Sequence, residues 1–145
     1  MSRRTIFALK GVSNTGKTQT INFVRRFIEE CYKDCKTAHD PLRRGSKEIT
    51  LILQVGNIKI GIESQGDPNS RLFNSIPYFV NKGCDLIVCA TRTRGATVEL
   101  VKSYKGYDTK WYSPNAVSSG VVEANTQKAQ EIFTDIKKLI DCSCT

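Results

Sequence analysis

A glycine loop that ends in lysine and threonine lies close to the start of this chain. Residues 11–18 read Gly-Val-Ser-Asn-Thr-Gly-Lys-Thr, which fits the pattern G-x-x-x-x-G-K-T. The apolar segment 5–10 before the loop predicts a short buried strand, and apolar residues at helical spacing after it predict an amphipathic helix. Strand, glycine loop and helix in this order are the context in which the pattern predicts a phosphate-binding loop.

The chemistry of this predicted phosphate loop (residues 11–18) follows from its residue types. Gly11 and Gly16 let the backbone turn tightly, so that consecutive N–H groups point toward a phosphate. We expect Lys17 to reach the β- and γ-phosphate oxygens and the Thr18 hydroxyl to coordinate Mg²⁺, with ATP or GTP as the ligand. The residues expected to contact the nucleotide are Gly11, Ser13, Asn14, Thr15, Gly16, Lys17, Thr18 and Gln19.

Length and composition favour one soluble domain. The 145 residues predict a single nucleotide-binding domain over 1–145, and 39% hydrophobic with 25% charged residues is ordinary for a globular protein. No apolar run approaches the length of a membrane span, and the apolar stretch 6–9 is too short for a secretory signal. We therefore expect a cytoplasmic protein with no membrane partner.

The middle of the chain predicts a loop, a hairpin and a helix. The polar segment 35–47 indicates an exposed loop. Two apolar runs, 48–54 and 58–62, flank Val55-Gly56-Asn57, which favours an antiparallel hairpin. Asp67 before Pro68 marks the start of a helix, which we expect to kink or break at Pro77.

The last third of the chain alternates strands and helices. The continuous apolar run 86–90 is typical of a central parallel strand, and a helix with apolar residues at 98, 100, 101 and 104 follows. Residues 109–112 predict the last strand and 123–140 the final helix. The predicted order is β-α-β-β-α-β-α-β-α, an α/β fold with helices on both faces of a mostly parallel sheet.

The finer form of the loop carries a family resemblance. Gly11-x-x-Asn14-x-Gly16-Lys17-Thr18-x-x-Ile21-Asn22 is similar to the version found in translation- and ribosome-associated GTPases. The chain thus resembles the P-loop NTPases of the GTPase and kinase branch. The resemblance implies a three-layer α/β/α fold with about five strands and an antiparallel hairpin edge. The guanine-specifying Asn-Lys-x-Asp motif of those GTPases has no match here, since Asn81-Lys82 is followed by Gly83-Cys84.

The same resemblance singles out Glu63. In that family the second hairpin strand ends in Asp-x-x-Gly, which senses the γ-phosphate, and the matching residues here are Glu63-Ser-Gln-Gly66. Because the strand ending at Glu63 is expected to lie beside the first strand, its carboxylate is a candidate Mg²⁺ ligand and catalytic group. The alternative is a solvent-facing glutamate at a strand end, and Asp67 nearby is expected to cap a helix.

Two arginines are further catalytic candidates. Arg92 and Arg94 follow the central strand, whose carboxyl end is expected to open at the same edge as the phosphate loop. Either guanidinium would stabilise charge on a transferring phosphoryl group or hold an anionic acceptor. The alternative is that both balance local acids. Thr37, Ser46 and Thr50 are candidates for completing the Mg²⁺ shell, and His39 is expected to be an exposed loop residue.

These features support three functions. The first is Mg²⁺-dependent hydrolysis of a nucleoside triphosphate by an ATPase or GTPase-like switch. The second is phosphotransfer, with Arg92 and Arg94 gripping a small-molecule or nucleic-acid-end acceptor, and the third is a sensor or assembly subunit without turnover. The net charge of +8 permits nucleic-acid contact, and a second copy or a partner protein could share the site. Six cysteines predict free thiols, the alternative being a zinc site from Cys31, Cys35, Cys142 and Cys144.

Overall fold

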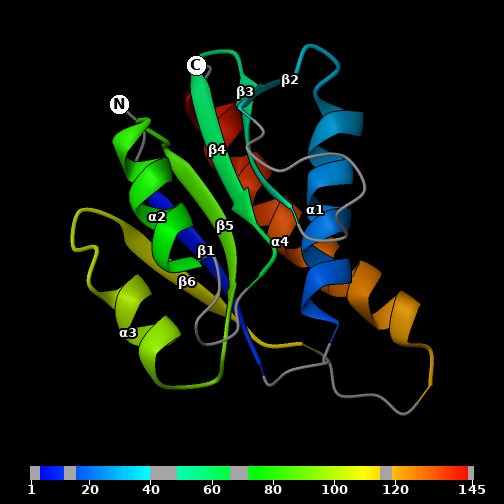
Figure 1. Ribbon diagram of the computed structural model, residues 1–145. Coiled ribbons are helices and arrows are strands. Elements are labelled where there is room, and N and C mark those ends of the chain that lie inside the picture. The colour runs from blue at the N-terminus through cyan, green and yellow to red at the C-terminus, as the bar shows by residue number, and fades with distance from the viewer. Residues whose placement is uncertain (1–3, 12–15, 40–48, 66–71, 115–118, 144–145) are drawn as a thin grey trace.

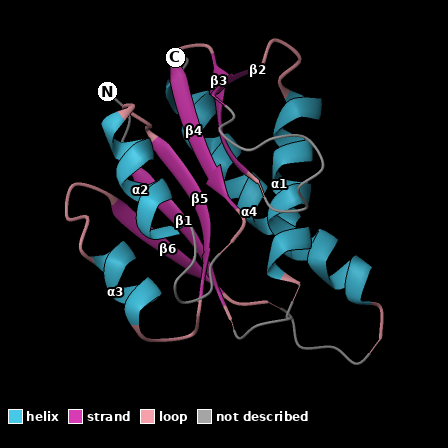
Figure 2. Cartoon of the chain, viewed as in Figure 1, coloured by secondary structure: helices cyan, strands magenta, loops and turns pink. Residues whose placement is uncertain are grey.

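The computed structural model describes residues 4–11, 16–39, 49–65, 72–114 and 119–143. Within these residues the chain is an α/β fold with four helices and one six-stranded mixed sheet (Figure 1, Figure 2). The strands are β1 Thr5–Lys10, β2 Lys36–His39, β3 Thr50–Val55, β4 Ile58–Glu63, β5 Leu86–Thr91 and β6 Asp108–Tyr112. The helices are α1 Lys17–Cys31, α2 Leu72–Asn81, α3 Ala96–Lys102 and α4 Val121–Ser143.

The strand order is β2-β3-β4-β5-β1-β6. β1 pairs in parallel with β5 and β6, and β4 pairs in parallel with β5. β3 runs antiparallel to β4, so the predicted hairpin is confirmed. The expectation that β4 lies beside β1 is wrong, because β5 lies between them. All six residues of β5 are buried, and a strand apolar on both sides is most stable in the middle of a sheet.

β2 corrects the prediction of a loop for residues 36–39, which include His39, while residues 40–47 of that predicted loop lie outside the described residues. Its residues pair antiparallel with β3, with Lys36 opposite Gln54 and Thr37 opposite Leu53, so the sheet has six strands in the described chain where about five were expected. Thr37 is exposed, as is common at the edge of a sheet. An edge strand is held by backbone hydrogen bonds to one neighbour, and these need no apolar pattern in the sequence.

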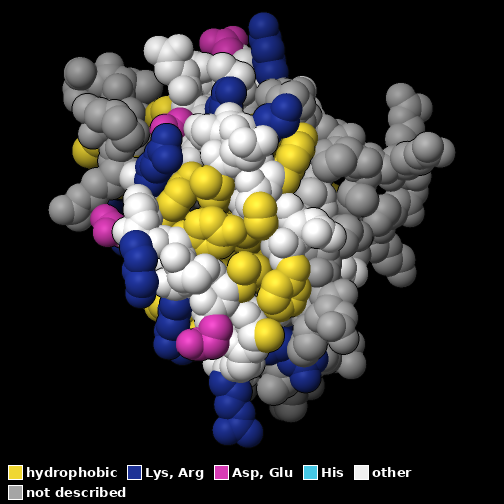
Figure 3. All heavy atoms as spheres, turned by 60° about the vertical axis from the view of Figure 1, so that its left-hand side comes forward, with side chains coloured by type: hydrophobic (Ala, Val, Ile, Leu, Met, Phe, Trp, Pro, Cys, Tyr) yellow, Lys and Arg dark blue, Asp and Glu magenta, His cyan; other side chains and the backbone are white. Residues whose placement is uncertain are grey.

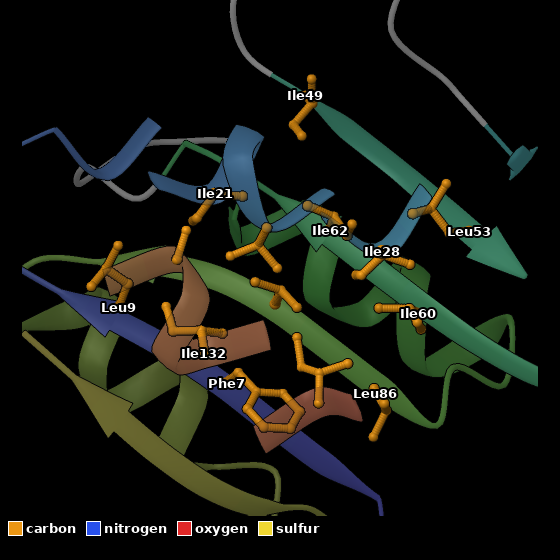
Figure 4. Close-up of a cluster of buried hydrophobic side chains, with 14 of the residues drawn as sticks. Phe7, Leu9, Ile21, Ile28, Ile49, Leu53, Ile60, Ile62, Leu86 and Ile132 are labelled. Carbon is orange, nitrogen blue, oxygen red and sulfur yellow. The ribbon is translucent and has the colours of Figure 1, made fainter. Parts of the chain in front are cut away.

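Helices cover both faces of the sheet (Figure 1). α1 and α4 lie on one face, where their apolar stripes meet alternate residues of the strands. Figure 4 shows part of this core, in which Phe7 and Leu9 of β1 lie beside Ile132 of α4, and Ile21 of α1 belongs to the same cluster. Burying each such side chain contributes about 1.5–3 kcal/mol relative to leaving it exposed. This packing holds α1 against β4, β5 and α4.

α2 and α3 cover the opposite face, where Phe79 and Val101 are buried against the sheet. A Cβ on Gly61 of β4 would lie 2.5 Å from Cγ of Phe79, so only glycine allows α2 to approach the sheet this closely. The sequence predicted a kink or a break at Pro77, and the break is wrong, because α2 continues through it to Asn81. Because Pro77 has no N–H, the helix lacks the backbone hydrogen bond from residue 77 to the carbonyl of Phe73.

The remaining elements agree closely with the prediction. β6 begins one residue before the expected strand, and α4 extends the expected 123–140 helix at both ends. Ile132, Ile136 and Ile140 of α4 are fully buried or nearly so, as their helical spacing predicts. No helix in the described ranges combines the length and the apolar character needed to cross a membrane.

Candidate functional site

The predicted phosphate loop leads from the carboxyl end of β1 into the first turn of α1. β1 ends at Lys10, and α1 begins at Lys17 directly after Gly16, whose φ is 81°. Only glycine adopts this left-handed conformation without strain. The first turn of α1 contains no acidic residue. The positive end of the helix dipole is therefore not neutralised by a carboxylate of its own first turn.

Two backbone carbonyls hold the ammonium of Lys17 at the start of α1. Its Nζ donates hydrogen bonds to the carbonyl oxygens of Gly11, at 2.7 Å, and Thr91, at 2.8 Å. The Thr91 oxygen also accepts a hydrogen bond from the Gly11 N–H at 3.1 Å. Lys17 is only 7% exposed. A nearly buried cation at the positive end of a helix creates a local potential that favours an anion.

The side chains around the loop differ in accessibility. Thr18 is half-buried and Gln19 is exposed in the first turn of α1, where both were predicted to contact a nucleotide. Ser13, Asn14 and Thr15 lie outside the described residues. The structure thus brings Gly11, Gly16, Lys17 and Thr18 to one end of the sheet, as the motif requires.

Asn125 belongs to this site and was missed by the sequence interpretation. It is 3% exposed on α4, and its Nδ2 donates a hydrogen bond of 2.7 Å to Oε1 of Gln19. A Cβ on Gly16 would lie 2.4 Å from the same Nδ2. A signal for it exists in the sequence, because Asn125 continues the buried stripe of Ala129 and Ile132 one turn toward the amino end of α4. A polar residue in an apolar stripe indicates a specific hydrogen bond.

The arginine-bearing loop begins at the same edge of the sheet. Lys10 at the end of β1 is in register with Thr91 at the end of β5, so the predicted shared edge is confirmed. The N–H of Arg92 donates a hydrogen bond of 2.9 Å to Oγ1 of Thr97, which fixes the start of this loop to α3. Arg92 is half-buried and Arg94 is exposed. The backbone of Arg92 therefore directly follows a carbonyl that holds Lys17.

The carboxylate of Glu63 lies on the face of the sheet covered by α2, away from the start of α1. The residue is fully buried, and its carboxylate accepts hydrogen bonds from Oγ1 of Thr50 at 2.5 Å, Oγ of Ser75 at 2.5 Å and N–H of Gln65 at 2.9 Å. Ser75 belongs to α2, so the carboxylate points to the face of the sheet opposite α1. The solvent-facing alternative is wrong for the same reason. The geometry supports a structural role that ties β3, β4 and α2 together.

The other candidates that fall within the described residues do not add metal ligands to the site. Thr50 is hydrogen-bonded to Glu63, and Thr37 is exposed on the edge strand β2. Ser46 and Asp67 lie outside the described residues, as does the side chain of His39. No cluster of three or more His, Cys, Asp or Glu side chains able to hold a metal occurs in the described ranges, and Cys144 is outside them.

The five cysteines in the described chain are free thiols that differ in burial, and Cys35 is half-buried. Cys31 and Cys142 are exposed free thiols near the ends of α1 and α4. Burial raises the pKa of Cys84 to about 12 from the ordinary 9.0, and burial raises the pKa of Cys89, with a further contribution from the charge of Glu63. The two buried thiols therefore stay protonated at neutral pH and act as small apolar side chains.

Comparison of the chain with protein-family models, with curated proteins and with solved structures found no match. The function must therefore be inferred from the residues of the chain and their geometry.

Proposed function

We propose that this chain binds the phosphates of a nucleoside triphosphate at residues 11–18 and catalyses its Mg²⁺-dependent hydrolysis. The observation that carries the proposal is the position of Lys17, whose ammonium is held at the start of α1 by the carbonyls of Gly11 and Thr91. A lysine at this position of G-x-x-x-x-G-K-T reaches the β- and γ-phosphates. A bound phosphate would offer the ammonium stronger, charge-assisted hydrogen bonds than the two neutral carbonyls do.

The residues fit Mg²⁺ in part. The half-buried Thr18 follows Lys17 and supplies a hydroxyl of the type that binds Mg²⁺ beside the phosphates. Glu63 does not fit as a second ligand, because its oxygens accept hydrogen bonds on the other face of the sheet. Mg²⁺ bound to nucleotides keeps several waters and takes only one or two protein ligands, so Thr18 with phosphate oxygens and water is an acceptable shell. The ion would neutralise charge on the phosphates.

Phosphotransfer is the second candidate, and the loop after β5 favours it. Arg92 directly follows Thr91, whose carbonyl binds Lys17, and Arg94 lies two residues further on, so their guanidinium groups are candidates for contacting a phosphoryl group or an anionic acceptor. Glu63 ends β4 toward this edge, but its carboxylate accepts hydrogen bonds from Thr50, Ser75 and Gln65, so we expect it not to orient an attacking water. Hydrolysis without a partner is therefore expected to be slow.

Calorimetric titration with Mg²⁺-ATP and Mg²⁺-GTP tests the binding step. We expect wild-type protein to bind at least one of them and Lys17→Ala to lose at least tenfold in affinity, because one charge-assisted contact is worth about 1.5–3 kcal/mol. Lys33→Ala is the matched control, since Lys33 is an exposed lysine beyond the other end of α1. Equal affinities of the Lys17 variant and wild type would rule out the proposed site.

Phosphate release then separates the reactions. Release from the nucleotide alone supports hydrolysis, whereas label transfer that needs an added acceptor supports phosphotransfer. Binding with neither release nor transfer indicates a sensor or assembly subunit and contradicts the proposed hydrolysis. Arg92→Ala and Arg94→Ala are expected to lower the rate of either reaction more than they lower nucleotide affinity, if the guanidinium groups stabilise the transition state.

A further inference from the structure

A lysine and an indole meet beside the predicted phosphate loop, on the face of the sheet that carries α3. Lys10 ends β1, and its Nζ lies 5.5 Å from the centroid of the Trp111 ring of β6, a cation–π contact. Both side chains are half-buried. The indole packs against the core under α2 and α3, so its position is fixed, and the contact restrains the lysine above it.

This pair lies next to the residues that hold Lys17. Lys10 precedes Gly11 in the chain and is in register with Thr91, and the carbonyls of Gly11 and Thr91 both bind Lys17. Neighbouring strands are about 4.8 Å apart, so the backbone of Lys10 lies about that far from the backbone of Thr91, the residue before Arg92. A ligand on Lys10 would therefore reach the edge where the phosphates are expected.

Lys10 and Trp111 lie on one face of the sheet, and α1 lies on the other. Alternate residues of β1 face the α1–α4 core or the α2–α3 core, and Lys10 continues the row of Ile6 and Ala8 on the α3 side. A nucleotide held by the first turn of α1 and a ligand held by Lys10 would then meet across the edge of the sheet. Phosphoryl transfer needs donor and acceptor on opposite sides of the transferred group.

The local charge favours an anion. In the described part of the chain neither Lys10 nor Arg94 forms an ion pair with a carboxylate. Glu63 faces the same side of the sheet, but β5 separates β4 from β1, and Thr50, Ser75 and Gln65 donate hydrogen bonds to its carboxylate. Asp108 lies at the other end of β6, opposite Thr5, and thus roughly 16 Å from Lys10 along the sheet. Figure 3 shows the side of the molecule that carries α2 and α3, where hydrophobic side chains gather and more Lys and Arg than Asp and Glu surround them.

We propose that Lys10 and Trp111 form the subsite for a second ligand, a phosphorylated nucleoside, which rests on the proposed nucleotide site at residues 11–18. The ammonium binds the phosphate, and the indole contacts the base through its edge, because Lys10 lies over the ring face and the ring packs against the core. If this ligand is an acceptor, one of its phosphate oxygens bonds to the γ-phosphorus as the bond to the β–γ bridging oxygen breaks. The products are a nucleoside diphosphate and the acceptor extended by one phosphate.

Trp111 is the only tryptophan of the chain, so its fluorescence reports directly on this subsite. Wild type and Lys17→Ala are titrated with AMP, GMP and thymidine monophosphate, with the matching nucleosides, and with inorganic phosphate. We expect a saturable change in both proteins with at least one monophosphate, and binding at least tenfold weaker for its nucleoside. A 5′-phosphorylated trinucleotide distinguishes the source of the ligand: tighter binding than the monophosphate indicates a strand end, and weaker binding indicates a free nucleotide.

Two variants make the test specific. Lys10→Met keeps an aliphatic chain over the indole and removes the charge, so we expect roughly a tenfold or greater loss of monophosphate affinity, measured by calorimetry as well. Lys10→Arg retains the charge and is expected to bind within a few-fold of wild type. Lys110→Met is the matched control, because Lys110 precedes Trp111 on β6, is exposed, and lies on the opposite face of the strand.

The outcomes separate the two proposals. Mg²⁺-ATP or Mg²⁺-GTP binding that Lys10→Met leaves intact, with monophosphate binding that it weakens, supports the second subsite. No response of Trp111 to any monophosphate, or equal losses in Lys10→Met and Lys110→Met, overturns it even if the triphosphate binds. An equal loss of triphosphate and monophosphate affinity in Lys10→Met also overturns it, because one site then explains both. A response that depends on Lys10 in a protein that binds no triphosphate would overturn the proposed function and leave only an isolated nucleotide site.

Discussion

Asn125 of α4 donates a hydrogen bond of 2.7 Å to Gln19 in the first turn of α1, and the same amide lies against Gly16. The contact joins helices more than a hundred residues apart in sequence at the point where the phosphates are proposed to bind. Because Asn125 is 3% exposed, its amide has little access to water. The geometry of the first turn of α1 therefore depends on the position of α4.

Gly16→Ala is expected to destabilise the protein strongly. The substitution places a Cβ at a φ of 81° and 2.4 Å from the Asn125 amide, so backbone strain and a steric clash add. Together they predict a loss of about 2–5 kcal/mol in the free energy of unfolding, measured in urea. Gly106→Ala is the control, because a Cβ there meets open space, and it should change stability by less than about 0.5 kcal/mol.

Combining Gly16→Ala with Asn125→Ala tests the contact itself. The second change removes the atoms that the new Cβ would meet and leaves only the backbone strain at residue 16. The double variant is expected to be about 1–3 kcal/mol more stable than the sum of the two single changes predicts. Strict additivity of the unfolding free energies would contradict the close contact between Gly16 and Asn125.

Gly61→Ala tests the approach of α2 to the sheet. The new methyl group would lie 2.5 Å from the ring of Phe79, which is fully buried and has no room to move away. Overpacking of this kind is expected to lower the free energy of unfolding by about 1–3 kcal/mol. Thermal and urea unfolding measure the effect against the same Gly106→Ala control. Unchanged stability would contradict the close approach of Phe79 in α2 to Gly61 in β4.

Glu63→Gln distinguishes a structural from a catalytic glutamate. Three donors point at the carboxylate, and a glutamine amide can accept from them with only one oxygen while its NH₂ faces a donor. We expect a loss of about 1–3 kcal/mol in stability, with nucleotide affinity retained. Glu99→Gln is the control, since the Glu99 side chain is 72% exposed.

Turnover of the folded Glu63 variant decides between the two roles. Phosphate release per folded molecule within about twofold of wild type indicates the structural role that the geometry supports. A loss of tenfold or more, about 1.4 kcal/mol in the barrier, would support the catalytic role predicted from the sequence.

Stability should fall at alkaline pH. In the folded state burial raises the pKa of Cys84 from 9.0 to about 12, and burial also raises the pKa of Cys89 and of Tyr112, whose hydroxyl donates to Asp135. Their contribution is fully present below pH 9 and is lost as the pH rises toward 12, because the unfolded chain releases these protons first. Urea unfolding between pH 7 and 10.5 should show this decline, and Cys84→Ala should make it shallower.

Thiol labelling checks the same burial independently. At pH 8 the exposed Cys31 and Cys142 are expected to react with a disulfide reagent in the native protein, whereas Cys84 and Cys89 should react only after unfolding. Mass spectrometry of the labelled peptides assigns the sites. Rapid native labelling of Cys89 would mean that the β5 strand opens readily and would contradict its central position.

Local patterns in the sequence were sufficient for most of the elements. Apolar periodicity predicted β1, α1, the hairpin of β3 and β4, and α4, because each buries one stripe or face against the sheet. The glycine loop predicted that Lys17 would stand where a strand passes into a helix, and the structure places it there. The resemblance to P-loop NTPases stays a prediction.

Contacts between distant segments were beyond such patterns. The edge strand β2 depends on backbone pairing with β3, which leaves no periodic signature. The sequence placed Glu63 at the end of a strand. The direction of its carboxylate depends on tertiary structure, because β5 lies between β4 and β1 and α2 supplies Ser75 as a hydrogen-bond donor. Asn125 reaches Gln19, and Lys10 reaches Trp111, only because α4 and β6 return to the start of the chain. Local sequence determined the elements through the burial each one needs, while strand order and helix packing determined which side chains meet.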